Sequence, residues 1–196
     1  MSTRPSRPEA EDHRDIRAGV RALCARFPGE YWRKLDRERE YPTDFVRALT
    51  AAGYLGCLIP EEFGGSGLGI GAAAAILEEV HASGGNGAAC HAQMYIMGTI
   101  LRHGSPAQKT KWLPEIAAGR LRLQAFGVTE PTAGTDTTAI RTSAIRRGDS
   151  YIVNGQKVWT SRAEHSDLML LLARTTPRGE RKTDGLSVFL VDMRKA

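Results

Sequence analysis

Two short segments contain residues that together could form a binding or catalytic site. The first runs from Phe126 to Asp136 and reads F-G-V-T-E-P-T-A-G-T-D, and the second runs from Asn154 to Ser161 and reads N-G-Q-K-V-W-T-S. The first combines small residues, hydroxyls and accessible backbone N–H groups around a proline, which suits a flat ligand with polar edges that approaches the main chain closely. The second places a tryptophan shortly after a turn signal. A T-E-P turn or an N-G pair alone is a weak signal, but their order and separation together indicate a cofactor site.

The first part of the chain, residues 8–119, has the periodicity of α-helices. Apolar residues recur at three- and four-residue intervals in its first segment, at Ile16, Val20, Leu23 and Phe27. Further helices are predicted over residues 42–52, 72–82 and 88–102, the last of which is apolar on most sides and is therefore expected to be buried. The run Ser105-Pro106-Ala107-Gln108 predicts the capped start of a final helix, which ends before Gly119.

After residue 120, alternating and β-branched residues predict an antiparallel sheet. The expected strands cover residues 121–128, 140–146, 151–160, 168–174 and 186–192. Turn signals at 147–150 and at Asn154-Gly155 suit tight hairpins, and residues 175–185 form a polar loop. The predicted fold class is therefore α+β. An N-terminal helical bundle in residues 1–120 precedes a partial antiparallel β-barrel or sandwich domain in residues 121–196.

Several motifs along the chain resemble the acyl-CoA dehydrogenases. They are L-I-P-E-E-F-G-G-S-G-L-G at 58–69, the helix start G-S-P-A-Q-K, the T-E-P turn, N-G-Q-K-V-W-T-S and the strand L-M-L-L-L-A-R-T. The resemblance implies an N-terminal helical domain, a middle β domain and a C-terminal helical domain, with FAD held between the last two and a neighbouring subunit. We expect this chain to supply the first domain and most of the second, and to end at Ala196 without the third.

The family pattern implies roles for four residues of the first segment. Phe126, Val128 and Thr129 are expected to line the flavin ring, with backbone N–H groups and the Thr129 hydroxyl directed at its pyrimidine edge. Preorganised donors at that edge favour the reduced cofactor, because reduction places negative charge there. Thr135 stands where the family usually has serine and is expected to contact the flavin phosphate or the acyl-CoA substrate.

The second segment completes the cofactor set with Trp159, Thr160 and Ser161. The resemblance implies that Trp159 lies against the flavin face opposite the substrate and that Ser161 offers its hydroxyl to flavin N5. A tryptophan on a strand is more often part of a core than a cofactor wall, but the flanking motif favours the cofactor wall here. Glu130 is not assigned as a base, because its counterpart in the family is structural.

The resemblance implies α,β-dehydrogenation of an acyl-CoA thioester. A carboxylate removes the α proton, the β hydride passes to FAD, and the electrons leave to an electron-transferring flavoprotein. In the family that carboxylate belongs to the C-terminal domain, so no catalytic residue is assigned in this chain, which is expected to be inactive or nearly so by itself. Two alternatives stay open: an acyl-CoA oxidase or flavin-dependent monooxygenase on the same scaffold, and a non-catalytic partner subunit or remnant that binds a full-length relative.

Composition argues against several other classes. Of the residues 41% are apolar and 25% charged, and no stretch is long and apolar enough for membrane insertion. Residues 141–196 hold eleven Lys and Arg against six Asp and Glu, mostly in turns and one loop rather than in a stripe, so no nucleic acid partner is expected. An anionic CoA tail could still bind to this surplus of positive charge.

The glycine run at 64–71 lacks the strand before it and the helix directly after it that a dinucleotide loop requires, and is expected to be a bend between helices.

Cysteine and histidine positions indicate neither a disulfide framework nor a metal site. Cys24, Cys57 and Cys90 are odd in number and far apart, and no fourth ligand is spaced with His81, Cys90 and His91. The N-terminus lacks the apolar core of a secretory signal. A cytoplasmic location is therefore expected. The family resemblance implies a place in fatty acid metabolism, while the choice between a homo- and a hetero-oligomer stays open.

Overall fold

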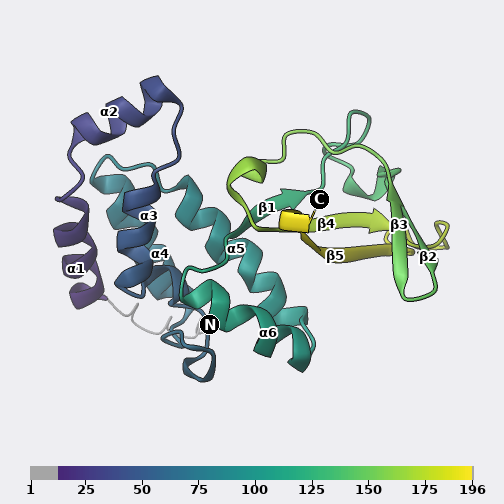
Figure 1. The fold of residues 1–196 in the computed structure, drawn as a ribbon, viewed down its shortest axis with the longest axis horizontal. Helices are drawn as coiled ribbons and strands as arrows, with labels where there is room; N and C mark the ends of the chain where they lie inside the picture. The colour runs from purple at the N-terminus through teal and green to yellow at the C-terminus, as the bar shows by residue number, and fades with distance from the viewer. Residues whose placement is uncertain (1–12, 196) are drawn as a thin grey trace, which may run out of the picture.

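The computed structural model describes residues 13–195, which form a helical part and a sheet part side by side (Figure 1). Helix α5 (Ala88–His103) lies next to strand β1 (Leu123–Gly127) at the junction of the two parts. The predicted α+β class, with the helical part first, is confirmed. The predicted helical residues 8–12, and the N-terminal segment searched for a targeting signal, lie outside the described residues.

Four of the predicted helices are confirmed to within two residues at each end. The described α-helices are α1 (Arg14–Cys24), α2 (Gly29–Glu38), α3 (Thr43–Ala51), α4 (Ile70–Ala82), α5 and α6 (Pro106–Ala117). Helix α2 was not predicted as a separate element; it is short, most of its residues are polar or charged, and none of its side chains is fully buried. None of the described helices combines the length and the apolar character that a membrane crossing requires.

Local sequence sets the ends of α6. The Ser105 hydroxyl accepts a hydrogen bond from the backbone N–H of Gln108 at 3.2 Å, and the Gln108 side chain accepts one from the Ser105 N–H at 2.9 Å. This reciprocal pair is the predicted capping box, and Pro106 fits the first turn because its missing N–H would have no partner there. Gly119 then leaves the helix with a φ of 71°, a left-handed conformation that glycine adopts without a steric penalty.

The sheet is mixed, with β4 at its centre. Its strands are β1, β2 (Ser143–Arg147), β3 (Ser150–Asn154), β4 (Leu168–Arg174) and β5 (Leu186–Asp192). Strands β4 and β5 pair antiparallel along their whole length, and β2 and β3 form an antiparallel hairpin, as predicted. Strand β1, however, pairs with β4 in parallel, and β2 joins β4 in parallel at Ser143 and Arg174. The alternation of residue types does not distinguish these directions, since side chains alternate in both.

The predicted strand over 151–160 is wrong in its second half. Strand β3 ends at Asn154, so Trp159 is not on a strand. The hairpin between β2 and β3 closes at the other predicted turn, where Gly148 has a φ of 60°, and Asn154-Gly155 marks the exit from the sheet instead. The segment leaves the sheet because the backbone N–H of Val158 donates to the carbonyl of Thr129, a partner outside every strand.

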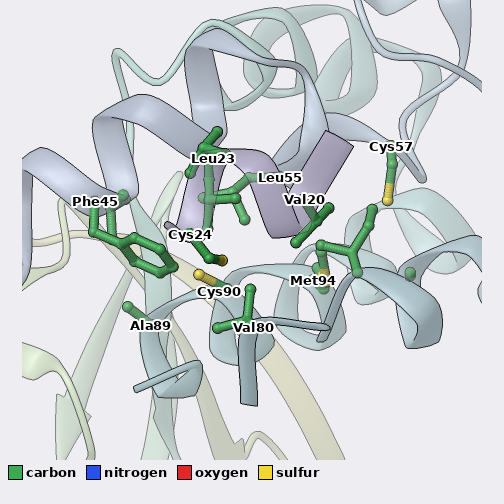
Figure 2. Close-up of a cluster of buried hydrophobic side chains, with 14 of the residues drawn as sticks. Val20, Leu23, Cys24, Phe45, Leu55, Cys57, Val80, Ala89, Cys90 and Met94 are labelled. Atoms are coloured by element: carbon green, nitrogen blue, oxygen red, sulfur yellow. The ribbon is translucent and has the colours of Figure 1, made fainter. Parts of the chain in front are cut away.

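Two clusters of buried apolar side chains form the core. The first lies among α1, α3, α4 and α5, and Figure 2 shows side chains such as Val20, Phe45 and Met94 converging there. The second contains residues of α5, α6, β1 and β4, including Met97, Leu113 and Leu168. Fully burying each such side chain contributes about 1.5–3 kcal/mol. Because the second cluster takes residues from both parts, it holds the sheet against α5, which is buried as predicted.

Candidate functional site

The two predicted cofactor segments meet in the structure. The backbone N–H of Val158 donates a hydrogen bond of 2.9 Å to the carbonyl oxygen of Thr129. The Lys157 ammonium donates to the carbonyl oxygen of Val128 at 3.0 Å and to Glu130 Oε1 at 2.9 Å. Residues almost thirty positions apart in the chain therefore form one surface directly after strand β1.

A tight turn follows this contact. The N–H of Glu130 donates to the carbonyl of Ala133 at 3.0 Å, and the N–H of Ala133 donates back to the carbonyl of Glu130 at 3.1 Å. Pro131 suits the second position of such a turn, because its ring presets the backbone angle. The turn places Gly134 and Thr135 on the surface, and a Cβ added at Gly134 would meet no atom within 4 Å. This stretch leaves room for a ligand to approach the main chain.

Glu130 is buried and anchors the turn to the strand that follows. Its carboxylate, 5% exposed, accepts hydrogen bonds from the backbone N–H groups of Arg141 at 2.6 Å and Thr142 at 2.8 Å, in addition to that from Lys157. Burial by itself raises the pKa of Glu130, but the hydrogen bonds from Thr142, Arg141 and Lys157 outweigh it and lower the pKa to about 2. Such a carboxylate is a poor proton acceptor near neutral pH, and its contacts are those of a structural residue.

Trp159 is the most exposed large apolar residue of the described chain. Its side chain is 89% exposed, and its φ of 59° lies in the left-handed region that residues other than glycine rarely adopt. The indole is therefore not part of the core, which removes the structural alternative considered for it. An exposed aromatic face held by an unusual backbone conformation can stack on a planar ligand.

The other predicted residues lie around these contacts with different exposure. Phe126 is half-buried on β1 and packs against the second core cluster. Val128, Thr129 and Thr160 are half-buried, whereas Ser161 is exposed. Thr135 is exposed beyond the turn, and no hydrogen bond within residues 13–195 joins it to the second segment. The structure thus brings residues 127–130 and 157–158 together and leaves Thr135 at the margin.

Sequence reasoning did not assign a role to Lys157, although it lies inside the second motif. Its side chain is 9% exposed, which is rare for a lysine unless it is paired. Within the sequence, only its position between the Asn154-Gly155 turn and Trp159 could have indicated a role for Lys157. The groups that its ammonium binds come from a distant part of the chain, so the contacts themselves could not be predicted.

A buried polar chain at the junction of the two parts was also missed. The Tyr41 hydroxyl donates to Gln124 Oε1 at 2.9 Å, and Gln124 Nε2 donates to Gln93 Oε1 at 3.4 Å. Gln124 is on β1 two residues before Phe126, and its N–H donates to the Ser166 hydroxyl at 3.2 Å. Burial raises the pKa of Tyr41, so its hydroxyl keeps its proton and stays a donor.

Comparison with known proteins assigns the family. The model of the acyl-CoA dehydrogenase N-terminal domain matches residues 10–120, and that of the acyl-CoA dehydrogenase middle domain matches residues 125–196. The chain belongs to the acyl-CoA dehydrogenase family. The resemblance predicted from the sequence motifs is confirmed.

Relatives and solved structures agree with this family assignment. The chain is 40% identical to acyl-CoA dehydrogenase FadE29 of Mycobacterium tuberculosis over 161 residues, which are 81% of this chain and 41% of that protein. It resembles the crystal structure of an acyl-CoA dehydrogenase from Geobacillus kaustophilus, with 28% identity, a TM-score of 0.85, and coverage of 98% of this chain and 50% of that one. A glutaryl-coenzyme A dehydrogenase in complex with glutaryl-CoA is similar at 30% identity and a TM-score of 0.82, over 99% of this chain and 49% of that one. The chain thus spans half or less of the length of these acyl-CoA dehydrogenases.

Proposed function

We propose that this chain supplies the helical and flavin-contacting parts of an FAD-dependent acyl-CoA dehydrogenase that carries out α,β-dehydrogenation of an acyl-CoA thioester. The observation that carries the proposal is the convergence of the two motif segments through Val158, Lys157 and Thr129. In this proposal residues 1–120 form the helical domain, and residues 121–196 form the β domain that contacts the cofactor. The matches of the two family models to 10–120 and 125–196 support that division.

The residues present fit a flavin. A flat ligand with polar edges needs an aromatic face, nearby hydroxyls and main chain that it can approach closely. The exposed indole of Trp159, the exposed hydroxyls of Ser161 and Thr135 and the open space at Gly134 meet these needs. The proposed cofactor residues are Phe126, Val128, Thr129, Thr135, Trp159, Thr160 and Ser161, with Thr135 also reaching the substrate.

Bound FAD supplies the hydride acceptor. The chain's own residues would orient it: the backbone N–H and hydroxyl of Thr129 would offer donors, and the exposed indole of Trp159 would stack on it. Removal of the substrate α proton needs a carboxylate with an ordinary or raised pKa, whereas the pKa of Glu130 is about 2 and its oxygens are occupied. We therefore propose that the base is supplied by sequence outside this chain and that the isolated chain does not turn over acyl-CoA. The complete enzyme would work in the cytoplasm, with an electron-transferring flavoprotein as its electron acceptor.

A titration of FAD into the purified chain tests the proposal. Binding should shift the visible flavin absorption and quench tryptophan emission. The chain has three tryptophans, of which Trp159 is the exposed one and Trp112 is half-buried on α6, so W159F should lose most of the quenching while the matched variant W112F retains it. A flavin spectrum that stays unchanged at saturating protein would count against the proposed cofactor site, and quenching that survives W159F would count against the role of the indole.

An activity assay separates the proposed reaction from its alternative. The isolated chain, mixed with FAD, an acyl-CoA and an artificial electron acceptor, should show no turnover, because Glu130, the buried carboxylate between the two segments, has a low pKa and its oxygens are occupied. Turnover at rates typical of dehydrogenases would overturn this part of the proposal. Oxygen consumption with release of peroxide would instead identify an oxidase.

A further inference from the structure

The side chain of Lys157 reaches across the end of strand β1. A Cβ added at Gly127 would lie 3.4 Å from Lys157 Cγ, 3.2 Å from Leu171 Cδ1 and 3.3 Å from Met169 Sδ. The aliphatic stem of the lysine therefore packs over the last residue of β1, beside side chains of β4. Glycine at 127 leaves the space that this packing needs.

The ammonium group of Lys157 is held from two sides. It donates to the carbonyl of Val128 at 3.0 Å and to the Glu130 carboxylate at 2.9 Å. Glu130 is itself fixed by the N–H groups of Arg141 and Thr142, so the lysine binds to an anchored partner and not to a mobile one. A charged hydrogen bond with both partners buried is stronger than a neutral one, and losing one partner leaves the other charge buried without compensation.

These contacts fix how the peptide between Val128 and Thr129 is turned. A trans peptide is planar, so its N–H points opposite to its carbonyl. Because the Val128 carbonyl points at Lys157, the N–H of Thr129 must point away from Lys157. The carbonyl of Thr129 is in turn held by the Val158 N–H, one residue after the lysine.

We propose that Lys157 is a positioning residue, which holds the Val128–Thr129 peptide in the orientation that presents the Thr129 N–H to the flavin and keeps the Trp159 segment against it. The identification of the ligand as a flavin rests on the proposed function. Lys157 acts through the main chain of its neighbours and not by touching the cofactor.

Three variants separate this role from simple packing. K157M keeps the length of the stem but removes the charged donor, and K157R keeps a charged donor of different shape. K182M removes an exposed lysine from the 175–185 loop of the same sheet part and serves as the control.

The first measurement is amide hydrogen exchange in the purified chain without flavin. In K157M the Val158 amide, which is bonded to Thr129, should exchange about tenfold faster or more, since a hydrogen bond to a charged group contributes on that order. Amides of β4 and β5 should keep their wild-type rates, K157R should recover most of the protection, and K182M should match the wild type. Unchanged exchange at Val158 in K157M overturns the proposal, and so does an equal acceleration in β4 and β5, because the lysine would then serve general stability.

The second measurement is the dissociation constant and absorption spectrum of bound FAD. K157M should weaken binding about tenfold and shift the flavin spectrum at saturation, and K157R should restore both in part. If the wild-type chain binds FAD and K157M binds it with the same affinity and spectrum, the positioning role fails while the proposed function stands. If the wild-type chain does not bind FAD, the proposed cofactor site fails, and the exchange rates still decide whether Lys157 holds the Thr129–Val158 contact.

Discussion

The Tyr41 hydroxyl donates a hydrogen bond of 2.9 Å to Gln124 Oε1, and this contact ties the helical part of the chain to the strand that leads into the cofactor segments. Both side chains are buried, with Tyr41 8% and Gln124 1% exposed. A buried polar pair across a domain junction favours one relative placement of the two parts, because any other placement would leave the groups without partners.

The Y41F variant should lower the free energy of unfolding by about 1–3 kcal/mol, because it leaves the Gln124 oxygen buried without its donor. Urea unfolding followed by circular dichroism measures the change. Y95F is the matched control, since Tyr95 lies half exposed on α5, and it should shift the midpoint little. Equal midpoints for Y41F and the wild type would contradict a role for the junction contact.

The stability of the chain should fall in acid, in part through Glu130. Its pKa is about 2 in the folded protein against an ordinary value of 4.5, so the folded state favours the ionised form. That contribution is present above the unfolded pKa and is lost as the pH falls from about 4.5 towards 2, and it amounts to about 3 kcal/mol. Unfolding of E130Q at a series of pH values should show a lower plateau near neutral pH and a shallower decline in this window. An acid limb as steep as that of the wild type would show that other carboxylates dominate.

A substitution at Gly155 should disturb the exit from strand β3. A Cβ at this position would clash with Thr142 Oγ1 and would lie 2.6 Å from Thr142 Cα, and the second of these atoms is backbone that cannot rotate away. G155A should therefore destabilise the protein by about 2 kcal/mol or more. G134A, where a Cβ meets nothing within 4 Å, is the control and should unfold like the wild type. The thermal midpoints of both variants test this, and a wild-type midpoint for G155A would argue against the close approach.

The three cysteines should resist thiol reagents while the chain is folded. Burial raises the pKa of all three thiols, that of Cys57 to about 11 and that of Cys90 to about 12, so almost no thiolate forms near neutral pH. Figure 2 shows them inside the first core cluster. Alkylation followed by mass spectrometry should find no adduct on the native protein within minutes and three adducts in denaturant. Rapid labelling of the native protein would show that this cluster opens readily.

Much of the helical part could be predicted because its signals are local. The capping box at Ser105 and Gln108, the apolar spacing on α5 and the glycine after α6 each act within a few residues of the position they determine. The family could be recognised for the same reason, since residue types and their order carry the resemblance. Prediction from local pattern failed where a distant partner determines the conformation. Residues 155–160 are the example: hydrogen bonds from Val158 to Thr129 and from Lys157 to Val128 hold this segment outside the sheet.

Local residue patterns were enough to predict the helical and strand parts in their order, with the exception of α2, and to identify the family. Three features became visible only in the folded chain: β1 runs parallel to β4, Lys157 and Glu130 join the two segments, and the indole of Trp159 lies outside the core. The physical reason is that strand direction and buried ion pairs depend on contacts between residues far apart in the chain. The energies of those contacts appear only when the backbone has brought the residues together.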